Sequence, residues 1–391
     1  MIGPDSGGRV NFLYTNIGRG HPHYLDGIIE QLDGQHLGQV AEVFALASGA
    51  SLGAWKVIRL LYRTAGSHRA VAYLYNRLRA HADYSRLGIG FPVLAGPLRR
   101  RFLSDGTPLV VAHPLLVAAL RDKPGLLYQH GEVAAPRESL VRGQHGVFVP
   151  TTHAADEFMA AGFAPAQILV SELCIEPGLV AQAETAFETR LRRISGSEPL
   201  CGAFLPSGAE PRLHVARLVA AAVAVAKRGG RAFLFAAEAG RFAAHAVAKF
   251  SEARVRLRQV RSVQAIHDRT QSCVLCIFRN RCDLNELTSE VFPEFDYFVS
   301  AAHERTSWAL GLGLPVFVVD PSLGSFAPDN RELLLKLGVG QAIRSMSEAA
   351  QIGRLIERLR RSGRLARMAE SGWGRFGIEG FGNIARVLSG L

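Results

Sequence analysis

Short apolar runs alternate with longer polar or amphipathic segments along almost the whole chain. Several runs in the first half have the continuous apolar character of strands that are buried on both faces of a parallel sheet. These runs are Val10–Thr15, Val40–Leu46, Pro108–Ala112, Gly125–Gln129, Gly146–Pro150 and Ile168–Leu173. The second half repeats the pattern with Leu200–Leu205, Arg231–Ala236, Val255–Val260, Cys273–Phe278, Asp296–Ser300 and Pro315–Asp320.

Helical segments separate these strands, and the clearest are Thr152–Ala161 and Pro211–Arg228. Strands that alternate with helices predict an α/β fold with parallel sheets covered on both faces. The length of 391 residues favours two domains. We place the first at residues 1–195 and the second at 199–375, because the polar segment between them ends in Ser195-Gly196-Ser197. Residues 376–391 form a final helix.

Polar turns follow strands at three places. The first is Ile17-Gly18-Arg19-Gly20-His21, the second is Ser207-Gly208-Ala209, and the third is His303-Glu304-Arg305-Thr306-Ser307. A turn that delivers a strand to a helix N-terminus gathers free backbone N–H groups and a positive dipole end. Two such halves facing each other would form a cleft suited to a phosphorylated donor.

An insertion at residues 52–104 interrupts the alternation. Its amphipathic segments Leu52–Arg63, Arg69–Ala82 and Phe91–Leu103 interleave aromatic residues with lysine and arginine, including the run Arg99-Arg100-Arg101. This composition is typical of a helix that lies in an anionic membrane surface. An ordinary surface helix with its apolar stripe on its own core has the same pattern, so both interpretations stay open.

The formal net charge of +11 indicates an acidic partner such as a diphosphate or anionic lipid headgroups. We expect no nucleic-acid partner, since no zinc finger, helix-turn-helix or aromatic-basic RNA motif is present. No apolar run is long enough for a transmembrane helix, and the first residues lack signal-peptide features. The odd cysteine count of 5 then favours a reduced, cytoplasmic protein. Cys273, Cys276 and Cys282 could suggest a metal site, but the apolar run around the first two favours core thiols.

The turn Gly18-Arg19-Gly20-His21, the aromatic-basic insertion and the late segments Leu310–Pro315 and Leu337–Gly340 together resemble a known family. They are similar to glycosyltransferases of the GT-B fold, especially monogalactosyldiacylglycerol synthases and the N-acetylglucosaminyltransferase of peptidoglycan lipid-intermediate synthesis. The resemblance covers nearly the whole chain in element order.

This resemblance implies two Rossmann-like domains that face each other across a cleft, with the C-terminal helix returning to the first domain. The first domain would bind a lipid or other hydrophobic acceptor, and the second a nucleoside-diphosphate-sugar, a UDP-sugar in the families named. Such enzymes need no metal or other cofactor. In two places the chain departs from them: Trp308 occupies the position of a ribose-binding glutamate, for which Glu304 could substitute, and Arg19 replaces a small residue.

Transfer of a sugar to a hydroxyl needs a base, for which the sequence offers two candidates. His21 follows the glycine turn at a helix start, where the positive dipole end favours the neutral imidazole. Glu132 follows a strand, beside His130, and a loop salt bridge to Arg137 is its structural alternative. His113, at the end of the preceding strand, is a lesser candidate.

The leaving diphosphate needs cationic or dipolar stabilisation. Ser207, Gly208 and Ala209 could contact a phosphate, and the cluster from His303 to Ser307 is the strongest candidate because it is polar between an apolar strand and an apolar helix. Arg305 would neutralise the diphosphate. Asp320, Asp329 and Asn330 would contact sugar hydroxyls, although Asn330 could equally cap a helix. For Arg279 and Arg281, solvated charge is favoured over a nucleotide contact.

The residues and the resemblance together indicate an inverting, metal-independent glycosyltransferase. It would move a sugar from a nucleoside-diphosphate-sugar to a lipid or other hydrophobic acceptor at the cytoplasmic face of a membrane. A nucleotide-sugar epimerase of the same architecture is the first alternative. A binding protein on a glycosyltransferase scaffold is the second, and Trp308 is the residue that keeps it open.

Overall fold

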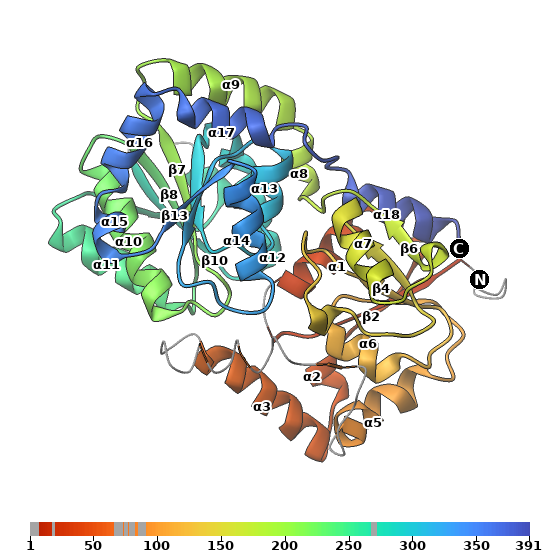
Figure 1. Cartoon of the computed structure of the whole chain (residues 1–391). Helices are drawn as coiled ribbons and strands as arrows, with labels where there is room; N and C mark the ends of the chain where they lie inside the picture. The colour runs from red at the N-terminus through yellow and green to blue at the C-terminus, as the bar shows by residue number, and fades with distance from the viewer. Residues whose placement is uncertain are drawn as a thin grey trace. The chain divides into compact units, whose positions relative to one another are not determined.

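The computed structural model describes residues 8–17, 20–65, 73, 77, 83–84, 91–266 and 272–391. Two compact units divide the chain. Unit 1 contains Met1–Pro177, Gly324–Asp329 and Gly377–Leu391, and unit 2 contains Gly178–Leu323 and Asn330–Phe376. Each unit is built on one parallel sheet, of 6 strands in unit 1 and 7 in unit 2, with helices packed on it (Figure 1). The expected α/β fold with two parallel sheets is confirmed.

The sheet of unit 1 has the order β2-β1-β3-β4-β5-β6. Its strands are β1 (Val10–Tyr14), β2 (Leu37–Glu42), β3 (Leu109–Val111), β4 (Leu126–Gln129), β5 (Gly146–Val149) and β6 (Ile168–Val170). Because side chains alternate along a strand, β1 sends Val10 and Phe12 to one face and Leu13 to the other, where separate apolar clusters cover them.

One cluster of unit 1 contains α1 (Gly20–Gln31) and α18 (Gly380–Ser389). Phe381 packs so closely on α1 that a Cβ at Gly27 would overlap its ring. The expected return of the C-terminal helix to the first domain is therefore confirmed. The other cluster includes residues of α2 (Val43–Leu46), α3 (Gly49–Ala65), α5 (Phe91–Phe102), α6 (Pro114–Leu120) and α7 (Thr152–Ala160).

The sheet of unit 2 has the order β13-β12-β11-β7-β8-β10-β9. Its strands are β7 (Cys201–Leu205), β8 (Arg231–Ala237), β9 (Arg258–Val260), β10 (Cys273–Phe278), β11 (Tyr297–Ser300), β12 (Val316–Val319) and β13 (Gly340–Ile343). Its helices are α9 (Ala183–Ser195), α10 (Arg212–Ala226), α11 (Arg241–Glu252), α12 (Arg281–Val291), α13 (Thr306–Gly311), α15 (Met346–Ala350), α16 (Ile352–Arg361) and α17 (Arg364–Gly372). Two further helices, α8 (Pro177–Val180) and α14 (Ala327–Lys336), begin in unit 1 and end in unit 2.

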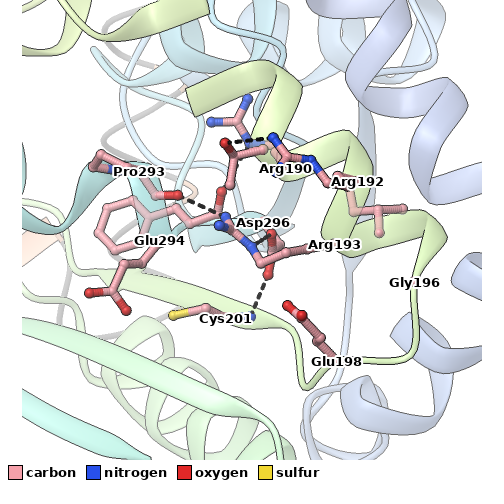
Figure 2. A network of polar contacts seen from close by, with 12 residues as sticks. Arg190, Arg192, Arg193, Gly196, Glu198, Cys201, Pro293, Glu294 and Asp296 are labelled. Atoms are coloured by element: carbon pink, nitrogen blue, oxygen red, sulfur yellow. Dashed lines mark hydrogen bonds and ion pairs between the residues drawn. The ribbon is translucent and has the colours of Figure 1, made fainter. Parts of the chain in front are cut away.

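Several details differ from the sequence analysis. The expected strand Val40–Leu46 is wrong in its second half, where Glu42 accepts a hydrogen bond from Ala45 N and starts α2 instead. The strand β13 was not predicted. Residues 178–195 belong to unit 2, whereas we expected the first domain to extend to residue 195. Arg193 explains this grouping, because it holds α9 to Asp296 beside β11 through a 2.8 Å ion pair (Figure 2).

Burial of His145 makes unit 1 sensitive to acid. Its ring packs against Tyr128 and Phe163, and neither ring nitrogen has a hydrogen-bond partner among the described residues. Burial lowers the pKa of His145 from 6.5 to about 4. The unfolded state therefore binds a proton that the folded state rejects, so the stabilisation is complete above pH 6.5 and is lost as the pH falls towards 4.

We predict that, between about pH 7 and pH 5, the free energy of unfolding falls by about 2 kcal/mol more in the wild type than in His145→Phe. Phenylalanine fits the same aromatic cluster and does not titrate. Urea unfolding followed by Trp55 fluorescence, with Trp308 and Trp373 replaced by phenylalanine, reports on unit 1. His153→Phe, at an exposed position of α7, is the control. Equal pH dependence in the wild type and His145→Phe would contradict the assignment.

Candidate functional site

The centre of the unit 2 sheet is a topological switch point. After β7 the chain builds β8, β9 and β10 on one side, and then crosses to build β11, β12 and β13 on the other. Leu205 of β7 pairs with Ser300 of β11, so both strands end at the same level. The loops that follow them leave the sheet side by side. In open parallel sheets ligands bind at this place, outside the carboxyl ends of the strands.

The first loop contains Ser207, Gly208, Ala209 and Glu210. Its turn is closed by Glu210 N, which donates to Ser207 O at 3.0 Å. Glu210 has a φ of 43°, a conformation that side chains rarely adopt. Its buried carboxylate holds it there by accepting a hydrogen bond from Phe242 N at 3.0 Å. The turn is thereby fixed to the start of α11.

The second loop runs from Ala301 into α13. Arg305 Nη1 and Glu304 Oε1 form an ion pair at 3.0 Å, and both side chains are nearly buried. Ser307 Oγ donates to Glu304 O at 3.0 Å, and Thr306 N donates to His303 O at 2.8 Å. These bonds place the polar cluster His303–Ser307 in one tight turn beside the first loop.

The carboxyl end of β12 is held at the same edge of the sheet. His214 of α10 hydrogen-bonds to Pro321 O at 2.7 Å, and Arg217 donates to Asp320 O. Arg331 of α14 makes two contacts with the Asp320 carboxylate, at 2.8 and 3.1 Å. Buried polar side chains thus join α10 and α14 to the loop that follows β12.

Several buried polar atoms at this edge lack a hydrogen-bond partner within the described part of the chain. They are Glu210 Oε1, His214 Nδ1, Arg305 Nε and Thr306 Oγ1. Buried polar atoms in folded proteins are nearly always paired, and leaving one unpaired costs about 1–3 kcal/mol. Because four such atoms lie at one strand edge, we treat this edge as the candidate site for a polar ligand.

Burial also sets the charge of the two histidines. It lowers the pKa of His214 to about 4, although the bond to Pro321 O opposes the shift. It lowers the pKa of His303 as well, partly offset by Glu304. Both imidazoles are therefore neutral at neutral pH, and Arg305 supplies positive charge beside the hydroxyl of Thr306. A cation next to neutral donors is suited to an oxyanion.

The structure places the candidate site residues of the second half in different surroundings. The structure brings Ser207–Ala209 and His303–Ser307 together. Asn330 lies inside α14, which begins at Ala327, so its interpretation as a helix cap is wrong. Its buried side chain instead donates to Ala302 O at 3.3 Å. Asp329 is exposed in the first turn of α14 and belongs to unit 1.

Trp308 occupies the position at which the resemblance implies a ribose-binding glutamate. It is 1% exposed and packs against Phe292 and Phe298, with ring centroids 6.4 and 5.7 Å apart. Its ring is therefore part of the core and does not reach a ligand. Glu304, one turn earlier, remains the carboxylate of this segment.

The candidates of unit 1 lie at the carboxyl edge of its sheet. Glu132 is 9% exposed in the loop after β4. His130 is buried, and its ring nitrogens lie 3.1 Å from Ala134 O and 3.4 Å from Tyr128 Oη. His113 caps α6 by accepting a hydrogen bond from Leu115 N at 3.1 Å. Arg137, the proposed partner of Glu132, pairs with Asp83 at 3.4 Å.

The glycine turn of unit 1 is described only in part. Gly20 and His21 begin α1, while Gly18 lies outside the described residues.

Cys273 and Cys276 are part of the core of unit 2. Cys273 and Cys276 are buried in β10, and burial raises the pKa of both thiols. Cys282 is exposed at the start of α12. Within the ranges that the structure describes, no three His, Cys, Asp or Glu side chains are grouped so that they could hold a metal ion.

Sequence reasoning missed Glu210, His214, Arg217 and Arg331. A signal was present for two of them. His214 and Arg217 are three residues apart in a mostly apolar helix, so both lie on one buried face. Polar side chains in that position need buried partners.

No protein-family model matches the sequence, and no curated relative does either. Solved structures do resemble it. The UDP-GlcNAc 2-epimerase of Neisseria meningitidis bound to UDP-GlcNAc has a TM-score of 0.53 at 10% identity, covering 97% of this chain and 98% of that chain. A putative UDP-N-acetylglucosamine 2-epimerase of Listeria monocytogenes has a TM-score of 0.54 at 11% identity, covering 97% and 95%.

MurG of Acinetobacter baumannii is a looser likeness, with a TM-score of 0.46 at 12% identity over 98% of this chain and 100% of that one. At such identities the two likenesses with TM-scores above 0.5 establish the fold alone. The chain has the expected GT-B fold.

We predict that Arg305→Gln weakens the binding of inorganic pyrophosphate roughly ten- to hundredfold, because a charge-assisted hydrogen bond contributes about 1.5–3 kcal/mol. Isothermal titration calorimetry measures this. The control is Arg228→Gln, which removes an arginine paired with Glu357 near the opposite edge of the same sheet. Equal losses in the two variants, or none in Arg305→Gln, would contradict the assignment of the site.

Proposed function

We propose that the protein is a glycosyltransferase that moves a sugar from a nucleoside-diphosphate-sugar to a hydroxyl of a lipid or other hydrophobic acceptor. The observation that carries this proposal is the set of unpaired buried polar atoms at the carboxyl ends of β7 and β11. The site would hold the diphosphate through Arg305, Thr306 and the amides of Ser207–Ala209. Glu304 would accept hydrogen bonds from the ribose.

Catalysis would follow from the same contacts. Arg305 would stabilise the negative charge that develops on the leaving diphosphate, so the proposed reaction needs no metal. A base must remove the proton of the acceptor hydroxyl, and His21 and Glu132 remain our two candidates. Direct displacement of the diphosphate by that hydroxyl inverts the configuration at the sugar carbon. Asp320, Asp329 and Asn330 stay proposed contacts of the donor sugar.

The acceptor proposal rests on α3. Val57, Leu60 and Leu61 are 55%, 60% and 55% exposed, and their spacing puts them on one face of the helix. The opposite face is held to α5 by Trp55 Nε1 and Ser51 Oγ, which both donate to Leu94 O. An exposed apolar stripe beside basic residues is suited to the interface of an anionic membrane. We therefore propose peripheral action at the cytoplasmic face of a membrane.

No helix among the described residues is both long enough and apolar enough to cross a membrane.

The second candidate function is a nucleotide-sugar epimerase. The Neisseria meningitidis enzyme, which has the same fold, is described as bound to UDP-GlcNAc. An epimerase would use the same donor site but has no use for the exposed stripe of α3. This stripe is the observation that favours the transferase.

The direct test is a transfer assay with a panel of UDP-sugars and vesicles that carry hydroxyl-bearing lipids. We predict that UDP release requires the vesicles and matches the amount of glycolipid formed. Glu304→Gln is expected to lower turnover at least about a hundredfold, as loss of an interaction of about 2.7 kcal/mol would. Glu238→Gln, at an exposed ion pair with Arg261, is the control. A changed sugar epimer without any need for vesicles would favour the epimerase instead.

A separate prediction concerns the membrane. The protein is expected to co-sediment with anionic vesicles, and less so as salt screens the charges. Leu60→Glu with Leu61→Glu should weaken binding at least about tenfold, since burying each leucine contributes about 1.5–3 kcal/mol. Val247→Glu changes an exposed apolar residue of α11 and should have no effect. Unaltered sedimentation of the double variant would contradict the role of α3.

A further inference from the structure

Trp308 lies directly beneath the diphosphate candidate Arg305. The guanidinium carbon is 5.2 Å from the centroid of the indole ring, within the range of a cation–π interaction. The guanidinium is nearly buried and is held on its other side by Glu304. Two contacts therefore set its direction, one from a carboxylate and one from an aromatic face.

The indole ring is itself fixed by a second buried arginine. Trp308 packs edge-on against Phe292, and the guanidinium of Arg190 lies 5.6 Å from the same phenylalanine ring. Arg190 is fully buried on α9, one turn from Arg193 of the network in Figure 2. Arg190, Phe292, Trp308 and Arg305 thus form a continuous row that ends at the site.

Arg190 also fixes the far end of α13. Its Nη1 donates to Leu312 O at 2.8 Å and to Gly313 O at 3.2 Å, and its Nε donates to Phe295 O at 2.9 Å. Burial lowers the pKa of Arg190 to about 9, which leaves it charged at neutral pH. A cation at carbonyls just beyond the C-terminus of a helix complements the helix dipole.

The helix between these two arginines is too short to be stable by itself. It contains 6 residues, and isolated helices below about twelve residues are marginal. Its orientation therefore depends on the contacts at its ends. Arg305 immediately precedes the first residue of α13. The carbonyls of Leu312 and Gly313, which Arg190 binds, follow its last residue.

We propose that Trp308 and Arg190 are positioning residues, which hold the guanidinium of Arg305 in the direction needed to bind the donor diphosphate. Trp308, which occupies the position expected for a ribose-binding glutamate, would thus affect donor binding indirectly, by orienting Arg305. The inference rests on the proposed function, because it needs a diphosphate ligand. Ordering a flexible arginine in advance lowers the entropic cost of binding.

The test compares UDP affinity, measured by titration calorimetry, with the free energy of unfolding. Trp308→Leu is expected to weaken UDP binding roughly three- to tenfold, and Trp308→Phe to restore most of it. Arg190→Lys should weaken it in the same direction, because an ammonium cannot span three carbonyls. The matched control is Trp373→Leu, whose tryptophan stacks on Phe187 of the same α9 at 4.4 Å. This control should lose stability but keep its UDP affinity.

Fluorinated tryptophan provides a measurement that does not depend on a folded leucine variant. In a Trp55→Phe, Trp373→Phe background, adding fluorine weakens the negative face of the Trp308 ring with little change in its size. UDP affinity should fall as fluorine is added. Unchanged affinity in both series, with wild-type binding intact, would overturn the inference alone. Failure of the wild type to bind UDP would overturn it together with the proposed function.

Discussion

The parallel pairing of β7 with β11 is the constraint on which the arrangement of unit 2 depends. These strands are distant in the chain, yet Leu205 and Ser300 are partners at their carboxyl ends. The sheet grows outward from this pair in both directions. The pairing brings two polar loops together, and the helices that follow them, α10 and α13, complete the site. The strand order therefore brings the candidate residues together, and the local sequence determines which side chains the two loops carry.

Buried polar groups distinguish the two edges of this sheet. At the amino edge, Asp296 is fully buried and accepts hydrogen bonds from Cys201 N and Arg193 (Figure 2). Burial raises the pKa of this carboxyl, which Arg193 opposes. Both carboxylate oxygens of Asp296 are therefore paired, and they hold α9 to the start of β11 and β7. At the carboxyl edge, Glu210 and Thr306 are also buried, but each keeps an unpaired atom. This contrast is the reason why we propose the carboxyl edge, and not the surroundings of Asp296, as the binding site.

Most of the fold could be predicted because buried parallel strands have apolar runs that local sequence displays. The signal is absent in β13, because its sequence Gly340-Gln341-Ala342-Ile343 has no continuous apolar run. The start of α2 was not predicted, because it depends on a single side-chain hydrogen bond from Ala45 N to Glu42. Within the site, the cluster at 303–307 was found because polar residues interrupt apolar ones. The roles of Glu210 and His214 were missed, since their partners Phe242 and Pro321 are remote in sequence.

Hydrogen–deuterium exchange of the full chain, with and without saturating UDP, is the most direct measurement of the central claim. We expect slower exchange in peptides that cover residues 206–210 and 303–307, because both loops would contact one diphosphate. Peptides at the amino edge, around residues 197–201, should be unaffected. Protection confined to the amino edge, or absent from both loops, would contradict it.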